Sequence, residues 1–93
     1  MHDESYIGAD FSVVDGVLKK YCGNSETVFV PYGIKVIGEE AFAYQDVKTV
    51  SLPHGLERIE TSAFLACCEL TEIIIPETVE FIGVRAFAYC NAL

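Results

Sequence analysis

The sequence predicts an α/β solenoid, a single domain in which short parallel strands stack from one coil to the next. Pro31, Pro53 and Pro76 are spaced 22 and 23 residues apart, and each follows an apolar, strand-like run. A decapeptide is also written three times, as VIGEEAFAYQ, RIETSAFLAC and FIGVRAFAYC. The residues before the first repeat have the pattern of a β-hairpin, which a solenoid needs as a cap over its first coil.

The composition indicates one folded domain with an acidic surface. A length of 93 residues is enough for one domain and too short for two, and a hydrophobic fraction of 52% supplies a core. The chain has 14 acidic and 6 basic residues and a net charge of -8, which repels phosphate backbones and anionic lipid. We therefore expect neither a nucleic-acid partner nor binding to a membrane surface.

The sequence also lacks features that direct a chain into a membrane. No apolar run approaches the ~20 residues that a membrane-spanning helix needs, so we expect no membrane insertion. The opening residues, MHDESYIGAD, lack the basic and apolar regions of a secretory signal peptide.

Superposing the repeats divides the single domain, residues 1–93, into a cap and three coils. The cap is expected over residues 1–24, and the repeats over 25–46, 47–69 and 70–92, with Leu93 at the start of a truncated fourth repeat. Each repeat is expected to form one right-handed coil of 22 or 23 residues. Its short strand should pair in parallel with the strand of the next coil, ~4.8 Å away.

Equivalent residues of successive coils should stack in ladders inside the solenoid. Two ladders are expected under the parallel strands: Val28/Val50/Ile73 and Val30/Leu52/Ile75. Two more are expected on the opposing wall: Ile37/Ile59/Ile82 and Phe42/Phe64/Phe87. Because no coil buries its apolar side alone, these ladders should be the main source of stability.

The remaining stretches of each coil are expected to be turns. Proline ends each strand because it donates no hydrogen bond to a central ladder. The alanine-rich EEAFAYQ is expected to form a short helical or 3₁₀ turn rather than a second long strand. The leader FSVVDGVLKKY is expected to be a hairpin whose two-residue type I′ turn is Asp15-Gly16, with Phe11, Val13 and Leu18 on one face.

The outward positions of the strands are those where the repeat stops being regular. They are Phe29, Ser51 and Ile74 in the middle of the strands, and Thr27, Thr49 and Glu72 two places earlier. Solenoids bind through variable outward residues of this kind. Phe29 and Ile74 are large apolar groups on a face expected to meet solvent, which favours a partner surface. Single exposed apolar residues are also ordinary in soluble proteins, and that alternative stays open.

The cysteines and histidines do not form a recognisable catalytic or metal motif. There is no CxxC pair among the four cysteines, and His2 and His54 are isolated, so we expect no metal site. Cys67 and Cys90 occupy the same repeat position, where they form either a reactive thiol pair or small buried ladder residues. A Ser51/His54 pair for hydrolysis lacks a third orienting group, and His54 is expected in an exposed turn.

The third repeat, LTEIIIPETVEFIGVRAFAYC, resembles the BspA-type (treponemal-type) leucine-rich repeat. The resemblance covers residues 25–93, with Gln45 in place of the usual cysteine and Glu60 in place of glycine. It implies a leucine-rich-repeat solenoid from a bacterial protein, often surface-exposed or secreted, that acts in adhesion or protein recognition. No catalytic residues belong to that family, so the resemblance implies no enzyme.

Three functional hypotheses follow, and none needs a cofactor. The first is a non-catalytic recognition or adhesion module that binds protein or glycan through the outward strand face, at the cell surface or outside the cell if the resemblance holds. The alternative is a structural spacer within a longer surface protein. A small hydrolase is a distant third. We also expect self-association through the open C-terminal coil, because its strand edge and ladder ends are uncovered.

Overall fold

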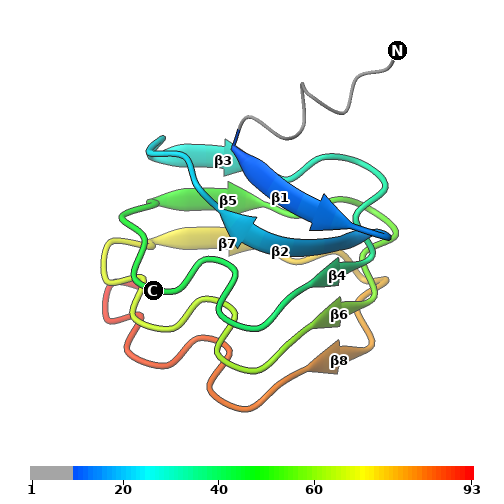
Figure 1. Cartoon of the computed structure of the whole chain (residues 1–93). Coiled ribbons are helices and arrows are strands. Elements are labelled where there is room, and N and C mark those ends of the chain that lie inside the picture. The colour runs from blue at the N-terminus through cyan, green and yellow to red at the C-terminus, as the bar shows by residue number, and fades with distance from the viewer. Residues whose placement is uncertain (1–9) are drawn as a thin grey trace.

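The computed structural model describes residues 10–93, which form a β-solenoid of three coils closed at one end by a hairpin (Figure 1). Each coil contributes one strand to each of two walls. The strands are β1 (Phe11–Val14), β2 (Val17–Tyr21), β3 (Thr27–Phe29), β4 (Val36–Ile37), β5 (Thr49–Ser51), β6 (Arg58–Ile59), β7 (Glu72–Ile74) and β8 (Phe81–Ile82).

The two walls are separate sheets. One has the order β3-β5-β7, with all neighbours parallel, and confirms the expected sheet of short strands. The other has the order β1-β2-β4-β6-β8, in which only the β1–β2 pair is antiparallel. The two-residue strands β4, β6 and β8 were not expected as a sheet, although their isoleucines were placed correctly on the opposing wall.

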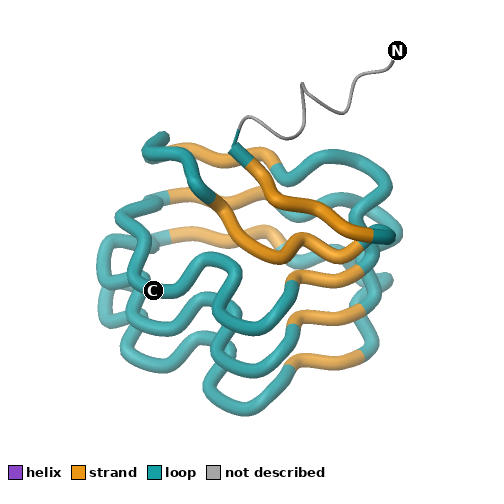
Figure 2. The backbone as a smooth tube through the Cα atoms, viewed as in Figure 1, coloured by secondary structure: helices purple, strands orange, loops and turns teal. Residues whose placement is uncertain are grey.

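The expected solenoid of stacked parallel strands is confirmed, but its helical or 3₁₀ turns are not found among residues 10–93. Residues 10–93 contain only strands, turns and bends, and none of them forms a helix that could cross a membrane (Figure 2). Glu40 and Tyr44 have φ values of 57° and 64°, and these left-handed residues interrupt any right-handed helix. The amides of Phe42 and Tyr44 therefore donate to carbonyls of the next coil, at 2.8 Å each, instead of four residues back along the chain.

The predicted hairpin is confirmed, including its turn. Val14 pairs with Val17, and the two residues between them, Asp15 and Gly16, have φ values of 51° and 79°, as a type I′ turn requires. The pairing register shifts between Ser12 and Val13, which marks a β-bulge. Of the predicted cap, residues 1–9 lie outside the described part of the chain.

Strand β2 acts as an incomplete coil rather than as an unrelated lid. Its residues Val17 and Leu18 pair in parallel with Val36 and Ile37, as each coil pairs with the next. Tyr21 then stacks on Phe42 with ring centroids 5.0 Å apart, and the Tyr21 amide donates to the next coil at 2.9 Å. The hairpin thus extends the ladder of one wall, and among residues 10–93 no further strand pairs with β3 on its outer side.

The four expected ladders are present, with Ile75 and Ile82 partly exposed at their last rungs, and the phenylalanine ladder is continuous. Phe42 and Phe64 stack at 4.8 Å and 12°, and Phe64 and Phe87 at 5.3 Å and 8°. Parallel rings are imposed by the coil repeat, which places equivalent residues about 4.8 Å apart. Phe11 adds a tilted fifth ring, 5.5 Å from Tyr21.

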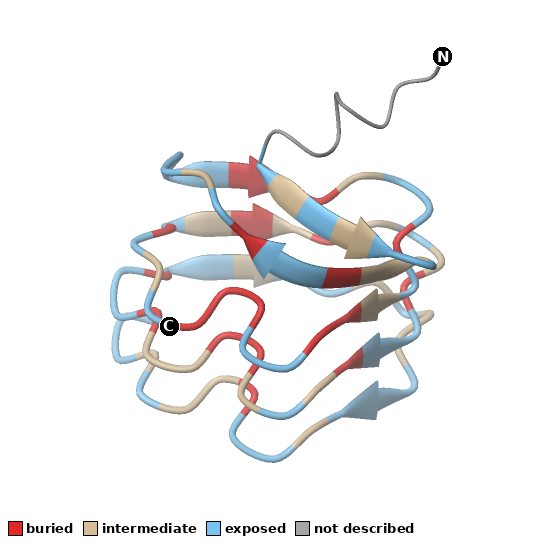
Figure 3. Cartoon of the chain, in the orientation of Figure 1, coloured by how far each residue is buried: buried red, intermediate tan, exposed pale blue. Residues whose placement is uncertain are grey.

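Burial decreases toward the last coil (Figure 3). Ile59 is fully buried in the second coil, whereas its equivalent Ile82 is 48% exposed. Likewise Leu52 is 5% exposed and Ile75 is 39% exposed. The last rung of each ladder lacks a neighbour on one side within the described structure, so the C-terminal end of the solenoid presents an apolar surface.

Two departures from the repeat have local explanations. The Thr78 hydroxyl, at the position of Gly33 and Gly55, donates to Leu56 O at 2.8 Å and accepts from Gly55 N at 3.1 Å, so it joins two coils. The Glu60 carboxylate, where the other coils have glycine, accepts a 2.8 Å hydrogen bond from Arg58 Nε. Both replacements therefore keep the coil geometry.

Candidate functional site

The outward face of the β3-β5-β7 sheet carries all six residues expected there. The pairing places Thr27, Thr49 and Glu72 side by side, and Phe29, Ser51 and Ile74 side by side. Val28, Val50 and Ile73 lie between the two rows and point inward, where Val28 and Val50 are buried. The strand periodicity thus separates core residues from surface residues as the sequence predicts.

The second row contains two apolar groups on an otherwise polar face. Phe29 is 72% exposed and Ile74 is 53% exposed, with half-buried Ser51 between them. Because neighbouring strands lie about 4.8 Å apart, Phe29 and Ile74 are separated by about 10 Å. The small Ser51 therefore separates two exposed apolar groups of the same row.

The rim beside this row adds an aromatic residue that sequence analysis did not assign to the site. Tyr32, in the turn after Pro31, is 86% exposed. Its equivalents in the next coils are His54 and Glu77, both also exposed. The sequence marks this position, because the residue directly after each proline falls on the same rim. No common residue type points to a binding role, however, since the side chain there differs in every coil.

The face is bordered by acidic residues. Glu72 lies in the first row and is exposed, and Glu26 directly precedes β3. Lys48 bridges two coils at this border, with its Nζ 3.6 Å from Glu26 Oε2, and both side chains are largely exposed. Such an exposed pair contributes little to stability, about 0–1 kcal/mol.

Among residues 10–93, the side chains considered for a catalytic or metal site do not come together. His54 is exposed and Ser51 is half-buried, and no hydrogen bond joins their side chains in the described structure. Within residues 10–93, no three His, Cys, Asp or Glu side chains lie close enough to hold a metal ion. His2 lies outside the described residues.

The equivalent positions Gln45, Cys67 and Cys90 perform a structural task. Each side chain donates to the backbone carbonyl of the aromatic ladder residue in the preceding coil. The donor–acceptor pairs are Gln45 Nε2 to Tyr21 O at 3.3 Å, Cys67 Sγ to Phe42 O at 3.0 Å, and Cys90 Sγ to Phe64 O at 3.1 Å. This arrangement favours the small-ladder-residue interpretation over a reactive thiol pair.

The acidity of the two thiols agrees with this role. Burial raises the pKa of the Cys67 thiol to about 11, and it also raises the pKa of Cys90. Reactive cysteines need the thiolate near neutral pH, which these environments disfavour. Cys22, Cys68 and both ladder cysteines are free thiols in the described structure.

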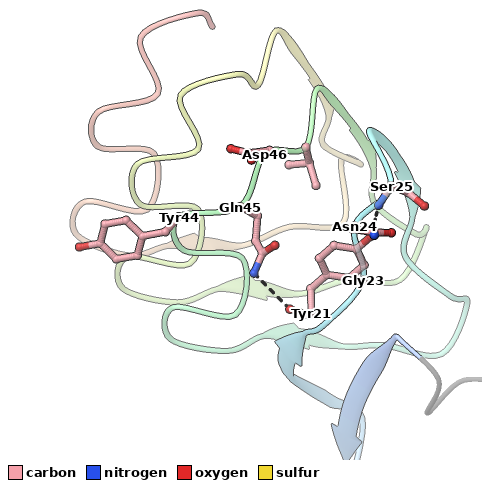
Figure 4. Close-up of a pocket in the computed structure, with 8 residues that line it drawn as sticks. Tyr21, Gly23, Asn24, Ser25, Tyr44, Gln45 and Asp46 are labelled. Carbon is pink, nitrogen blue, oxygen red and sulfur yellow. Dashed lines mark hydrogen bonds between the residues drawn. The ribbon is translucent and has the colours of Figure 1, made fainter.

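A small pocket lies where the cap joins the first coil (Figure 4). It has a volume of about 140 Å³ and is lined by Tyr21, Gly23, Asn24, Ser25, Tyr44, Gln45, Asp46 and Val47. Two of its polar groups are already used, because Gln45 donates to Tyr21 O and the Ser25 amide donates to the Tyr21 hydroxyl. The Tyr44 ring points away from these groups, so they do not converge on one ligand position.

A family model described as a BspA type leucine rich repeat region with 6 copies matches residues 15–93. This chain belongs to the BspA-type leucine-rich repeat family. The match begins at the hairpin turn, in agreement with the role of β2 as an incomplete coil. The family and its structural neighbours are repeat proteins without a described catalytic activity.

Solved structures of bacterial leucine-rich repeat proteins are similar to this member of the family. They include a T. pallidum leucine rich repeat protein, with 26% identity and a TM-score of 0.81. The match covers 83% of this chain but only 39% of the length of the T. pallidum protein. A Bacteroides capillosus protein is 25% identical with a TM-score of 0.79, covering 90% of this chain and 78% of that one. A leucine rich cell surface protein of Faecalibacterium prausnitzii is 26% identical with a TM-score of 0.74, covering 83% and 24%. No curated protein matches the sequence.

Proposed function

We propose that this BspA-type repeat domain is a non-catalytic module that recognises a protein through the outward face of β3, β5 and β7. The observation that carries the proposal is the exposure of Phe29 and Ile74 on a face whose other outward residues are short or polar. The fold does not need these two groups, because its core is built from the inward residues of the same strands.

A protein ligand fits this face better than a small molecule. The face is an open sheet, whereas small-molecule ligands are usually enclosed in a concave pocket. Exposed aromatic and aliphatic groups spaced about 10 Å apart match the side-chain spacing of a protein surface or an extended segment. A glycan would instead need several hydrogen-bonding side chains. In the row of Phe29, Ser51 and Ile74, only Ser51 has one.

The proposed setting is the bacterial cell surface or the extracellular space, with a role in adhesion. The similar Faecalibacterium prausnitzii structure is of a cell surface protein, and the proposal extends that setting to this chain. A net charge of -8 is compatible with such a role, since it opposes nonspecific contact with anionic lipid and nucleic acid.

The proposal is tested by selecting ligands from a displayed library of random 12-residue peptides against the purified chain. Ligands that use the face should bind a Phe29→Ser, Ile74→Ser double variant at least tenfold more weakly, because both apolar anchors are lost. The matched control is Tyr44→Ser, which changes an exposed aromatic residue away from the face and should leave affinity within twofold.

Two results would contradict the proposal. One is the absence of any enriched peptide in repeated selections, which would favour the alternative of a structural spacer. The other is a set of ligands that bind the double variant as tightly as the parent chain, provided that both unfold at the same urea concentration.

A further inference from the structure

Strand β3 has a free edge at the capped end of the solenoid. It is the first strand of the β3-β5-β7 sheet, and the hairpin extends only the other sheet, through β2 and β4 (Figure 1). An edge strand with unpaired backbone groups is a template for another strand. Among residues 10–93, no strand covers this edge.

The register identifies the backbone groups that face outward. Glu26 O accepts from Thr49 N at 3.0 Å, and Val30 N donates to Ser51 O at 3.0 Å, so alternate residues of this strand face β5. The N–H and C=O of one residue point to the same side of a strand, and successive residues alternate. The backbone groups of Thr27 and Phe29 therefore point to the free edge, which offers two donors and two acceptors.

A groove runs beside this edge. It has a volume of about 180 Å³ and is lined by Asp10, Phe11, Tyr21, Ser25, Thr27, Val28 and Phe29. Tyr21 and Val28 are buried and Phe11 is half-buried, so the floor is apolar. Asp10, Ser25 and Thr27 are exposed polar residues. The groove therefore combines an apolar floor, a polar rim and a row of main-chain partners.

The charge around the groove is acidic. Asp10 lines it, and Glu26 directly precedes the strand that forms its wall. No lysine or arginine lines the groove in the described part of the chain. Lys48 contacts Glu26 at 3.6 Å from the β5 side, but both side chains remain largely exposed. A basic partner would therefore meet favourable charge here.

We propose that an extended segment of a protein partner adds to the free edge of β3 as a fourth strand of its sheet. One apolar side chain of the segment would enter the groove over Phe11 and Val28, and flanking basic side chains would lie near Asp10 and Glu26. This inference deepens the proposed protein recognition and rests on it. Alternate side chains of the bound segment would give specificity, and hydrogen bonds to the backbone of Thr27 and Phe29 would give affinity that does not depend on the segment's sequence.

The same charges disfavour a second copy of the chain as the occupant. Pairing of two β3 edges would join two acidic surfaces, because each copy carries Asp10 and Glu26 beside this edge. Like charges across a strand pair destabilise it, and each copy carries a net charge of -8. A basic, alternating segment of another protein avoids this repulsion.

The experiment uses the full 93-residue chain labelled with ¹⁵N and a capped heptapeptide, Thr-Lys-Val-Lys-Val-Lys-Thr. Titration should shift the amide resonances of Thr27 and Phe29, and solvent exchange of these two amides should slow at least fivefold on saturation. The Thr49 amide, which already donates to Glu26 O, serves as the internal control and should not gain protection. The matched acidic peptide, with glutamate in place of each lysine, should bind at least tenfold more weakly.

Two changes separate strand addition from side-chain binding. N-methylation of the peptide at the central lysine or at the valine that follows should weaken binding at only one of these adjacent positions, because successive N–H groups face opposite edges. In the protein, Thr27→Pro removes an outward N–H, keeps the amides that face β5, and should weaken binding at least fivefold. Thr27→Val is its control, and it should bind within twofold of the parent chain.

Each outcome decides the inference. Absence of peptide binding, or equal binding of both N-methylated peptides by the parent chain, would overturn it. If the peptide shifts only Ser51 and Ile74, strand addition is wrong while recognition through the outward face stands. If the library yields no ligand that depends on Phe29 and Ile74 but the heptapeptide still protects Thr27 and Phe29, the edge acts without the face. The peptide arm keeps the test valid even if Thr27→Pro lowers stability.

Discussion

Besides Asp15 in the hairpin turn, six non-glycine residues have left-handed backbone conformations, two at equivalent places in each coil. Their φ values lie between 57° and 64°: Glu40, Tyr44, Ser62, Ala66, Arg85 and Tyr89. This conformation brings the Cβ of an ordinary residue close to its own carbonyl, at a cost of about 1–2 kcal/mol. The coil-to-coil hydrogen bonds of the same segments offset that cost, since the amides of Ser62 and Ala66 donate to the next coil at 3.0 and 2.8 Å.

Replacing Ala66 by glycine should therefore stabilise the domain. Glycine adopts the required φ of 58° without a steric cost, and its larger loss of backbone entropy offsets only part of the gain. We expect the free energy of unfolding in urea to rise by up to about 1 kcal/mol. Ala63→Gly is the control, because Ala63 is fully buried and has no positive φ, and it should destabilise. A lower stability for Ala66→Gly would contradict this account.

The buried thiol of Cys67 should make stability depend on pH in the alkaline range. Its folded-state pKa is raised to about 11 by burial, whereas an unfolded thiol ionises from its ordinary pKa near 9. The contribution of the protonated Cys67 thiol to the free energy of unfolding is thus complete below about pH 9 and is lost as pH rises toward 11. Cys67→Ser keeps a donor to Phe42 O and does not titrate, so its unfolding free energy should fall less between pH 8.5 and about 10.5. Parallel pH curves for both proteins would refute the prediction.

At the scale of elements, the aromatic ladder joins the hairpin to the coils. Tyr21 is 1% exposed, stacks on Phe42 and accepts a hydrogen bond from the Ser25 amide at 3.1 Å. Tyr21→Ala should cost about 3–5 kcal/mol, as removal of a buried aromatic ring does, and should detach the hairpin from β4. Tyr44→Ala removes a ring that is 72% exposed and should change stability by less than about 0.5 kcal/mol. Thermal unfolding followed by circular dichroism distinguishes the two variants, and similar midpoints would contradict the role of Tyr21.

The β6–β8 contact depends on a glycine. A Cβ on Gly83 would lie 2.5 Å from Thr61 N and 2.8 Å from Glu60 C, both backbone atoms that cannot move alone. Gly83→Ala should therefore separate β8 from β6 and destabilise the chain by about 1–3 kcal/mol. Amide exchange should accelerate in residues 81–93 but not in the hairpin. Glu60→Ala is the control, because it changes the equivalent position of the preceding coil and loses only the Arg58 contact, so its effect should be small. Unchanged amide exchange in the Gly83→Ala variant would disprove the steric argument.

At the scale of the whole molecule, the C-terminal end of the described structure exposes apolar rungs. Ile82, Ile75 and Leu93 are 48%, 39% and 54% exposed, while their equivalents in the second coil are buried. We predict that the 93-residue polypeptide self-associates through this end at high concentration, and more strongly when salt screens its charge of -8. Ile82→Glu should shift the equilibrium toward monomer in sedimentation experiments, and Val14→Glu at the hairpin end should not. A parent chain that stays monomeric in concentrated, high-salt solution would disprove this prediction.

Much of the fold could be predicted because a solenoid repeats its local chemistry. Pro31, Pro53 and Pro76 mark equivalent strand ends, and alternation within VFVP, VSLP and IIIP separates inward from outward residues. That alternation alone predicts that Phe29, Ser51 and Ile74 lie on one face, without knowledge of the strand pairing. The Asp15-Gly16 turn was predictable for the same reason, since its conformation depends on two adjacent residues.

Other features depend on contacts between coils, and no local pattern reveals them. The AFAY segment has helix-favouring alanines, but the amides of Phe42 and Tyr44 bond to Ala63 and Leu65, 21 positions away, and left-handed turns replace the expected helix. The shorter first repeat shows the same dependence. Asp46 alone spans the place that Cys68 and Glu69 occupy one coil later, and it fits because Gln45 reaches the Tyr21 carbonyl with a longer side chain than cysteine.

The repeat, the membership of each ladder and the orientation of the strand face are properties of the chain read one coil at a time, because each coil meets only its neighbours and presents the same residues to them. The free edge of β3 cannot be read from one coil and its neighbours in this way. This edge exists because Val17 and Leu18 pair with β4, so the hairpin extends one wall, and no strand of residues 10–93 pairs with the outward backbone groups of Thr27 and Phe29 on the other. Which wall receives the cap depends on packing of Phe11 and Tyr21 over the phenylalanine ladder, a long-range contact that becomes visible only in three dimensions.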